Sequence, residues 1–393
     1  MPPTCPFSQF PDPFGKAREA TGTEEIDDQG DPVRMVLRYE EVRNCAQDWQ
    51  TFRSGAAPGR IVVPSEVAIR DLRQIPFETD PPDHTNYRQL LEDWFRRPND
   101  PEYVDGLTQL VDDALDTAVA AGRIDAVHDF ALPLQSRALT LLLNCPQREA
   151  DVWINWGTHV FRSEDDPLDA GKANQLYDYL EEQISRARAN LPGGNDLYAE
   201  LLRARFRGRA LTHEEVKGAM VLVFAGGRDT VINAVTNCLA YFAEHSQQLK
   251  ELGGKRVAVS RAVEELLRYF APLTHMGRVV EQPSSVADTP VAADRRISLC
   301  WAAANRDPAA FDRADEVVID RRRNPHLSFG FGVHRCLGAD HARQLLRVLL
   351  TRMSERGVAI EAFDGRENLE QWGSFERKVG FHWLNIVMTE KER

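Results

Sequence analysis

Apolar residues recur every three or four positions along most of the chain after residue 84, which is the spacing of amphipathic helices. Four early segments carry this pattern: HTNYRQLLEDWF, PEYVDGLTQLVDDALDTAVAAG, PLQSRALTLLL and DVWINWGTHVF. The longest predicted helix begins with a capping box of Thr212 and Glu215 and continues to about His245, on the order of 50 Å. SRAVEELLRYF and ADHARQLLRVLLTRMSERG predict two further helices.

Two regions carry the short β-branched runs that are typical of strands. The first, residues 33–63, contains VRMVLRY and RIVVP around a predicted helix, EEVRNCAQDW, and the second covers residues 277–300. We therefore predict a mainly α-helical fold with a small β subdomain. Because no repeat or proline-rich linker divides the chain, we expect one domain over residues 1–393, with a small sheet in residues 1–79 and mostly helices in residues 80–393.

Composition and charge narrow the class of protein. The 393 residues, 42% of them apolar, can bury a large core, and the formal net charge of −12 argues against nucleic acid as a partner. The N-terminus lacks a basic start followed by an apolar run, and no stretch reaches the roughly 18 apolar residues of a membrane span. The cysteines form no CxxC pair, so we expect free thiols in a reducing cytoplasm. They are Cys5, Cys45, Cys145, Cys238, Cys300 and Cys336.

The stretch FGFGVHRCLG, residues 329–338, surrounds one cysteine with glycines directly before a predicted helix. The N–H groups and dipole at a helix N-terminus favour a thiolate at Cys336, and His334 and Arg335 add positive potential. The glycines let a large flat group come close to the backbone. A metal ligand fits this pattern, although a lone cysteine beside a turn is more often a buried structural residue.

The stretch FAGGRDT lies inside the longest predicted helix. Each glycine in a helix interior costs about 1 kcal/mol relative to alanine, so Gly226 and Gly227 need a reason, such as a planar ligand against that face. Asp229 and Thr230 place a carboxylate and a hydroxyl beside them, which suits a proton relay. The alternative is a close helix–helix contact with a solvated Asp229.

Two sets of charged residues say little when each is taken singly. Glu265 and Arg268 in EELLRY are three positions apart and share a helix face, as many weak surface pairs do. Four cationic or imidazole side chains could converge on an anionic cofactor edge, but each alone is more often a solvated charge or a core histidine. These four are His84, Arg88, Arg278 and His334.

Together and in this order, the motifs resemble the cytochrome P-450 family of haem-thiolate monooxygenases. FGFGVHRCLG is similar to the haem-binding loop of the family, AGGRDT to its oxygen-binding helix, and ELLR to the helix pair that follows. DPPDHTNYR resembles the HxxxR propionate-binding helix, and ANRDPAAF the stretch ahead of the haem loop. The resemblance covers roughly residues 80–360.

The resemblance implies a fold with haem b between the long central helix and the cysteine loop. It implies that Cys336 is the proximal iron ligand, that Asp229 and Thr230 deliver protons for O2 chemistry, and that Glu265 and Arg268 form a structural pair behind the haem. It implies haem-binding roles for His84, Arg88, Gly226, Arg278, Phe329, His334, Cys336 and Gly338.

The chain departs from the family pattern at one position of the structural network. The arginine that joins the Glu–Arg pair falls on Glu316 here, so Arg313 or Arg321 is expected to substitute. Because the chain contains no flavin or iron–sulfur segment, the resemblance to soluble bacterial members implies electrons from NAD(P)H through a ferredoxin or flavodoxin and its reductase. Acidic partners of this kind would dock on a local basic patch. The patch is expected at Arg335, Arg343 and Arg347.

The segments that contact substrate in the family supply mostly apolar residues here, which favours a small to medium apolar organic substrate. The expected lining is Ile61, Val62, Val63, Ile69, Ile75, Trp153, Trp156, Phe161, Phe224, Leu273, Met276, Trp372 and Phe375, with His275 as a polar exception. Hydroxylation is the default chemistry, and oxidative O-demethylation stays open. A non-catalytic haem ligand-binding protein and a peroxide-driven enzyme are disfavoured by the Asp229–Thr230 pair.

Overall fold

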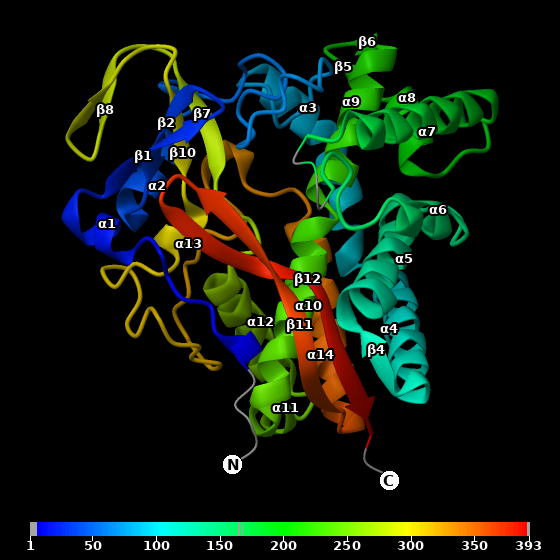
Figure 1. The fold of residues 1–393 in the computed structure, drawn as a ribbon. Coiled ribbons are helices and arrows are strands. Elements are labelled where there is room, and N and C mark those ends of the chain that lie inside the picture. The colour runs from blue at the N-terminus through cyan, green and yellow to red at the C-terminus, as the bar shows by residue number, and fades with distance from the viewer. Residues whose placement is uncertain (1–5, 164–165, 167, 391–393) are drawn as a thin grey trace.

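The computed structural model describes residues 6–163, 166 and 168–390, and most of them lie in a helical body with small sheets at its edges (Figure 1). The predicted class, mainly α with a small β part, is confirmed. The helices are α1 (Gly15–Ala20), α2 (Tyr39–Gln47), α3 (Asp83–Glu92), α4 (Pro101–Ala121), α5 (Leu132–Leu143), α6 (Glu149–Asn155), α7 (Ala170–Ala189), α8 (Leu197–Arg203), α9 (His213–Gly226), α10 (Asp229–Glu244), α11 (Ser246–Leu252), α12 (Arg256–Phe270), α13 (Trp301–Ala304) and α14 (Ala339–Arg356).

The largest apolar core lies where the long helices pack together. α4 packs against α5 and α14, and α14 packs against α11 and α12. Leu107, Val111 and Leu115 follow the helical spacing of α4 and are fully buried. Burial of apolar stripes such as this one stabilises the helices, because isolated helices of this length are marginal in water.

The main sheet has the strand order β1-β2-β10-β7-β3 and lies at the opposite side of the molecule from α4 and α5 (Figure 1). Its strands are β1 (Thr23–Asp28), β2 (Asp31–Val36), β3 (Phe52–Arg53), β7 (Met276–Val280) and β10 (Arg296–Leu299), and β8 (Ser284–Val286) and β9 (Thr289–Val291) form a separate hairpin. The prediction of a strand at RIVVP is wrong. Its backbone turns there, with the Val62 N–H donating to the Gly59 carbonyl. Ile61 instead accepts a hydrogen bond from Gly277 N–H at the end of β7, at 2.9 Å.

The C-terminal segment forms a long hairpin that the sequence analysis did not foresee. β11 (Ala359–Trp372) and β12 (Phe375–Thr389) pair antiparallel, and β12 also pairs with β4 (Arg123–Asp125). The hairpin crosses in front of α10 and α14 in Figure 1, and it contacts α10. Most side chains of β11 are exposed or half-buried, so its sequence shows no clear alternation, whereas β12 is buried along much of its length.

The longest predicted helix is broken in two. Its capping box is confirmed, because Thr212 Oγ1 accepts from Glu215 N–H while the Glu215 carboxylate accepts from Thr212 N–H. However, α9 ends at Gly226 and α10 begins at Asp229. The expectation that no stretch is apolar enough to span a membrane is wrong for His213–Glu244, which is long and apolar enough, yet 61% of its most apolar window is buried inside the protein, as in many core helices.

Candidate active site

A cavity of about 330 Å³ lies between the break in this long helix and the loop that precedes α14. Residues from α3, β7, α9, α10 and the cysteine loop line it, although these elements are spread over more than 200 positions of the sequence. All ten residues that the sequence analysis assigned to the site meet at this cavity: His84, Arg88, Gly226, Asp229, Thr230, Arg278, Phe329, His334, Cys336 and Gly338.

The cysteine loop closes on itself before α14. The Cys336 N–H donates to the Phe329 carbonyl at 2.7 Å, and α14 begins three residues after the cysteine. Gly332 has φ +71°, and a Cβ on it would lie 2.5 Å from the Ala46 carbonyl oxygen of α2. Only glycine therefore lets the loop pack on α2 and present the Cys336 thiol to the cavity.

The environment of the Cys336 thiol contains opposing influences. Burial raises the pKa of the thiol. The Gly338 N–H and the nearby Arg88, Arg343 and Arg335 lower it. The Gly338 N–H near the start of α14 favours the thiolate, as expected, but the effect of burial is larger and the pKa of the thiol is raised overall. The four other described cysteines, Cys45, Cys145, Cys238 and Cys300, are free thiols, and Cys5 lies outside the described residues.

Four positive or imidazole groups meet at one edge of the cavity. The rings of His84 and His334 lie edge to face with centroids 4.2 Å apart, and His84 Nδ1 and His334 Nε2 are buried without hydrogen-bond partners. Burial lowers the pKa of Arg278 to about 10, and burial together with Arg88 lowers that of His84 to about 4. The groups destabilise one another's charged forms, which is the electrostatic setting of an anion site.

Arg88 also holds the cysteine loop directly. Its Nη1 donates to the Arg335 carbonyl at 2.8 Å and to the Val333 carbonyl at 3.4 Å, while its Nε bonds Glu92 at 2.8 Å. α3 and the loop are thus joined at the cationic edge of the cavity.

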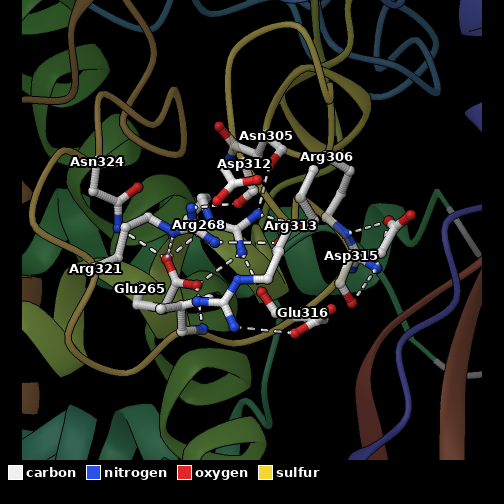
Figure 2. A network of polar contacts seen from close by, with 12 residues as sticks. Glu265, Arg268, Asn305, Arg306, Asp312, Arg313, Asp315, Glu316, Arg321 and Asn324 are labelled. Atoms are coloured by element: carbon white, nitrogen blue, oxygen red, sulfur yellow. Dashed lines mark hydrogen bonds and ion pairs between the residues drawn. The ribbon is translucent and has the colours of Figure 1, made fainter.

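Behind the cysteine loop, Glu265 and Arg268 of α12 form a fully buried pair (Figure 2). All five N–H donors of Arg268 are used, because its guanidinium bonds both Glu265 oxygens and three carbonyls. The three carbonyls belong to Asn305, Ala314 and Glu316. The pair therefore fixes the segment that leads into the loop.

Arg321 is the third member of this network, as one of the two sequence-based alternatives expected. Its Nε donates to Glu265 Oε2 at 2.8 Å, and Asn324 Nδ2 bonds the same oxygen at 3.1 Å (Figure 2). Arg313 does not substitute, because its exposed guanidinium bonds only the Glu316 carboxylate among the contacts described, at 3.5 Å. At position 316 the backbone carbonyl, rather than the side chain, bonds Arg268.

At the break in the long helix, Gly227 follows the last residue of α9 and Arg228 turns away from the cavity. A Cβ on Gly227 would lie 2.6 Å from the Val223 carbonyl, whereas a Cβ on Gly226 would meet no atom within 4 Å. Arg228 is buried, and its Nη2 donates to the carbonyls of Trp153, at 2.7 Å, and Gly157. Gly226 therefore leaves open space on the cavity side, as the sequence analysis expected of the glycine pair.

Asp229 and Thr230 begin α10 at the cavity, and a histidine that the sequence analysis missed stands beside them. Burial raises the pKa of Asp229 to about 6. His159 Nδ1 accepts from the Phe161 N–H, so its proton is on Nε2, which lies 3.9 Å from the Asp229 carboxylate. The Thr230 hydroxyl donates to the Gly226 carbonyl at 3.1 Å. The start of α10 thus combines a carboxyl group of raised pKa with a hydroxyl group, and an imidazole N–H lies 3.9 Å from that carboxyl group.

His159 reaches the cavity because the predicted helix over residues 151–161 is too long. α6 ends at Asn155, and Gly157, with φ +77°, turns the chain into a loop. The loop carries His159, Phe161 and Arg162 to the cavity wall. Gly157 after an aromatic-rich helical run was the signal for this end.

The expected apolar lining is only partly at the cavity. Val62, Phe161, Leu273 and Met276 line it, whereas Trp153, Trp156 and Phe224 pack on one another in the core, as do Trp372 and Phe375 in another core cluster. The remaining members of the expected set, Ile61, Val63, Ile69, Ile75 and His275, are also away from the lining.

Polar side chains occupy part of the wall instead. Glu66, Gln74, His159 and Arg162 line the cavity. Glu66 bonds Arg70 at 2.9 Å and lies 3.9 Å from Arg162, and burial raises its pKa. The Arg162 Nε is buried without a hydrogen-bond partner.

These features fit a large, flat, anionic cofactor. His84 and His334 line the cavity and each has a buried imidazole nitrogen without a hydrogen-bond partner, Gly226 leaves open space beside the cavity, and the Cys336 thiol supplies a soft metal ligand. The residues present therefore fit a haem.

Comparisons with known proteins agree with this geometry. A model of the family "Cytochrome P450" matches residues 257–356. Cytochrome P450 monooxygenase PikC of Streptomyces venezuelae is 30% identical over 84% of this chain and 79% of its own length. The 20-oxo-5-O-mycaminosyltylactone 23-monooxygenase of Streptomyces fradiae is 30% identical over 91% of this chain and 84% of its own length. A solved structure described as that of a carbohydrate active P450 is 54% identical, with a TM-score of 0.94, covering 98% of this chain and 99% of that one.

Proposed function

Because the chain belongs to the cytochrome P450 family and is a monooxygenase by that membership, we propose that its substrate is a carbohydrate rather than an apolar compound. One observation carries the proposal. The cavity wall holds Arg162, whose Nε has no hydrogen-bond partner and whose Nη2 lies 3.9 Å from the Glu66 carboxylate, and it also holds His159 with its Nε2–H. Polar atoms left without partners in a cavity disfavour an apolar ligand, because each loses water without gaining a hydrogen bond.

A sugar hydroxyl is a suitable partner for each of these groups. It accepts from the Arg162 guanidinium and from His159, and it donates to the Glu66 carboxylate. Leu273, Met276 and the apolar part of the wall would cover the C–H face of a pyranose ring. The 54% identity to a carbohydrate active P450 over nearly the whole chain supports the same substrate class.

The haem would be held by Cys336 as iron ligand and at its propionates by His84, Arg88, Arg278 and His334. When bound, this group supplies the iron at which O2 is activated. Phe329, Gly338 and Gly226 would contact its faces, and Glu265, Arg268 and Arg321 keep the cysteine loop in position from behind.

The protein's own part in the reaction is the handling of protons. Burial raises the pKa of Asp229 to about 6, so this carboxyl group can release and recover a proton at neutral pH, while the neutral His159 ring presents its Nε2–H 3.9 Å from the carboxylate. Thr230 can give up its hydrogen bond to the Gly226 carbonyl and donate toward the cavity. Delivery of two protons and two electrons balances the release of one oxygen atom of O2 as water while the other enters a substrate C–H bond.

Two products remain open within this reaction class. Oxygenation of a ring or hydroxymethyl C–H gives a hydroxylated sugar, whereas oxygenation of a methoxy group gives a hemiacetal that breaks down to an alcohol and formaldehyde. The purified holoenzyme can be supplied with NADPH, a plant-type ferredoxin and ferredoxin reductase, and incubated with methylated and unmethylated hexoses. Turnover of any of these sugars supports the proposal, and formaldehyde in the amount of the sugar consumed identifies demethylation. Turnover of terpenes or fatty acids with no sugar consumed would overturn it.

The supply of electrons by a ferredoxin or flavodoxin and its reductase, in the cytoplasm, belongs to the same proposal. Two of the three arginines expected to form the basic patch lie against an acidic side chain of the protein itself. Arg343 is bonded to both Glu264 oxygens, at 2.7 and 2.8 Å, and Arg347 lies 3.8 Å from the same carboxylate. Arg335 is exposed, and it is therefore the cation that an acidic redox partner would meet first.

A further inference from the structure

Three buried side chains from three different helices form a hydrogen-bonded chain that ends at the break between α9 and α10, the two halves of the distal helix. The Tyr103 hydroxyl of α4 bonds His341 Nδ1 of α14 at 2.7 Å, and His341 Nε2 bonds Gln135 Oε1 of α5 at 3.2 Å. Gln135 Nε2 then donates to the Gly227 carbonyl. Tyr103, Gln135 and His341 are 6%, 1% and 3% exposed, so each is shielded from bulk water.

The direction of every bond in this chain is determined by its last member. A carbonyl only accepts, so the Gln135 amide group donates to Gly227 and its Oε1 must accept from His341 Nε2–H. Burial lowers the pKa of His341 to about 4, so the neutral ring has a free acceptor at Nδ1, to which Tyr103 donates. All three donors therefore point toward the helix break, and none can be reversed without breaking the chain.

The Gly227 carbonyl needs this outside donor. In an unbroken helix Val231 N–H would serve it, but Val231 and Ile232 both donate to the Arg228 carbonyl, at 3.1 and 3.0 Å. A carbonyl that is partly shielded from water and has no partner costs free energy, and Gln135 supplies the missing hydrogen bond. Arg228 anchors the other side of the break on the end of α6.

We propose that Gln135 and His341 are positioning residues that hold the break open in one geometry and thereby orient Asp229 and Thr230 at the cavity. His341 is five residues after Cys336 on the helix that follows the cysteine loop, so the chain links the two sides of the cavity through protein atoms. The proposal concerns the distal helix alone and does not depend on which substrate is bound.

The test compares Gln135→Leu with Ser136→Ala in the haem-loaded protein. Ser136 is the neighbouring residue, equally buried, and its hydroxyl has no partner, so it controls for a disturbance of α5. The infrared C–O stretch of the carbon monoxide complex reports the polar groups that surround the ligand. We expect the single band of the parent protein to broaden or split in Gln135→Leu and to stay unchanged in Ser136→Ala. Amide exchange in a peptide over residues 223–232 should rise about fivefold or more, as expected for one lost buried hydrogen bond.

Further variants separate a directed chain from general loosening. His341→Leu should reproduce the effect of Gln135→Leu, and the double variant should add nothing, because both act on one bond. Tyr103→Phe should have a smaller effect, since it removes only the hydrogen bond that keeps the proton of His341 on Nε2. If Gln135→Leu does not fold, Gln135→Met, which keeps the length of the side chain but has no hydrogen-bond donor, replaces it. An unchanged C–O band and unchanged exchange in the Gln135 variant, or additive effects in the double variant, would overturn the proposal.

Discussion

The cavity has a proximal side, which carries the cysteine loop, and a distal side, which carries the break between α9 and α10. Both sides contain buried charged residues, but these residues differ in how many of their hydrogen-bonding groups have partners. On the proximal side, every N–H of Arg268 is bonded, and Glu265 accepts from Arg268, Arg321, Asn324 and the Val318 N–H. On the distal side, the buried Arg162 Nε has no partner. The charged groups on the proximal side are fully hydrogen-bonded within the folded protein. Arg162 on the distal side keeps a donor that a ligand could use.

The pKa values of the two buried carboxyl groups follow the same division. Burial by itself would raise the pKa of Glu265, but its bonds to Arg268 and Arg321 bring it below its ordinary value. Burial raises the pKa of Asp229 to about 6, and the nearby Arg162 only partly opposes this. A carboxylate that is fully paired supports the fold, and one that is poorly paired is able to exchange protons.

The largest effect is expected from Arg268→Met, which would leave Glu265 buried and unpaired. Loss of one partner of a buried pair costs about 3–5 kcal/mol, so we expect little folded, haem-loaded protein. Arg313→Met is the control, because Arg313 is exposed and bonds only Glu316 among the contacts described. The measurement is urea unfolding followed by tryptophan fluorescence. Equal midpoints for the two variants would contradict the assigned role of the proximal pair.

Asp229→Asn should stabilise the protein at neutral pH while impairing turnover. Because the folded-state pKa is raised to about 6, the folded protein binds this proton more tightly than the unfolded chain. The stabilisation of the folded state by the proton on Asp229 is complete below about pH 4 and is lost as the pH rises through 6. Relative to the parent, the variant should gain up to about 3 kcal/mol between pH 4 and pH 7.5. Unfolding curves at the two pH values that show no relative gain would refute the assigned burial cost.

Arg162→Met should weaken sugar binding with little effect on folding. A hydrogen bond to a charged group contributes about 1.5–3 kcal/mol, so we expect the Kd to rise about 10- to 100-fold. Arg186→Met, which removes a half-exposed arginine of α7 that does not line the cavity, is the matched control. The Kd is read from the Soret shift. If both variants bind sugar as the parent does, Arg162 has no part in recognition.

The smallest effect is expected at the surface. Arg335→Glu should slow reduction by an acidic ferredoxin about two- to fivefold at low ionic strength and should lose this effect at high salt. Arg123→Glu, an exposed arginine of β4, controls for the change in net charge. Stopped-flow reduction rates that are the same for both variants would remove Arg335 from the docking surface.

The sequence predicted the proximal side well because its residues are close together along the chain or carry a helical spacing. Local patterns placed Cys336 before α14 and Glu265 with Arg268 on one face of α12, whereas their roles, and Arg321 as one of two alternatives, came from the family resemblance. The break at Gly227 was not foreseen, because its compensating donor, Gln135, lies 92 positions away. The polar wall was missed for a similar reason. Glu66, His159 and Arg162 lie on irregular segments, where no helical or strand periodicity predicts which way a side chain points.

A paired Soret titration tests whether the distal cavity is built for a polyhydroxylated ligand. A mono-O-methyl hexose and methoxycyclohexane share a six-membered ring and a methoxy group but differ in the ring hydroxyls that Glu66, His159 and Arg162 would bind. We predict that the hexose shifts the holoprotein from low to high spin with the lower Kd, and that Arg162→Met abolishes this preference. A lower Kd for methoxycyclohexane in the parent protein, unchanged in Arg162→Met, would contradict the assignment of a carbohydrate substrate.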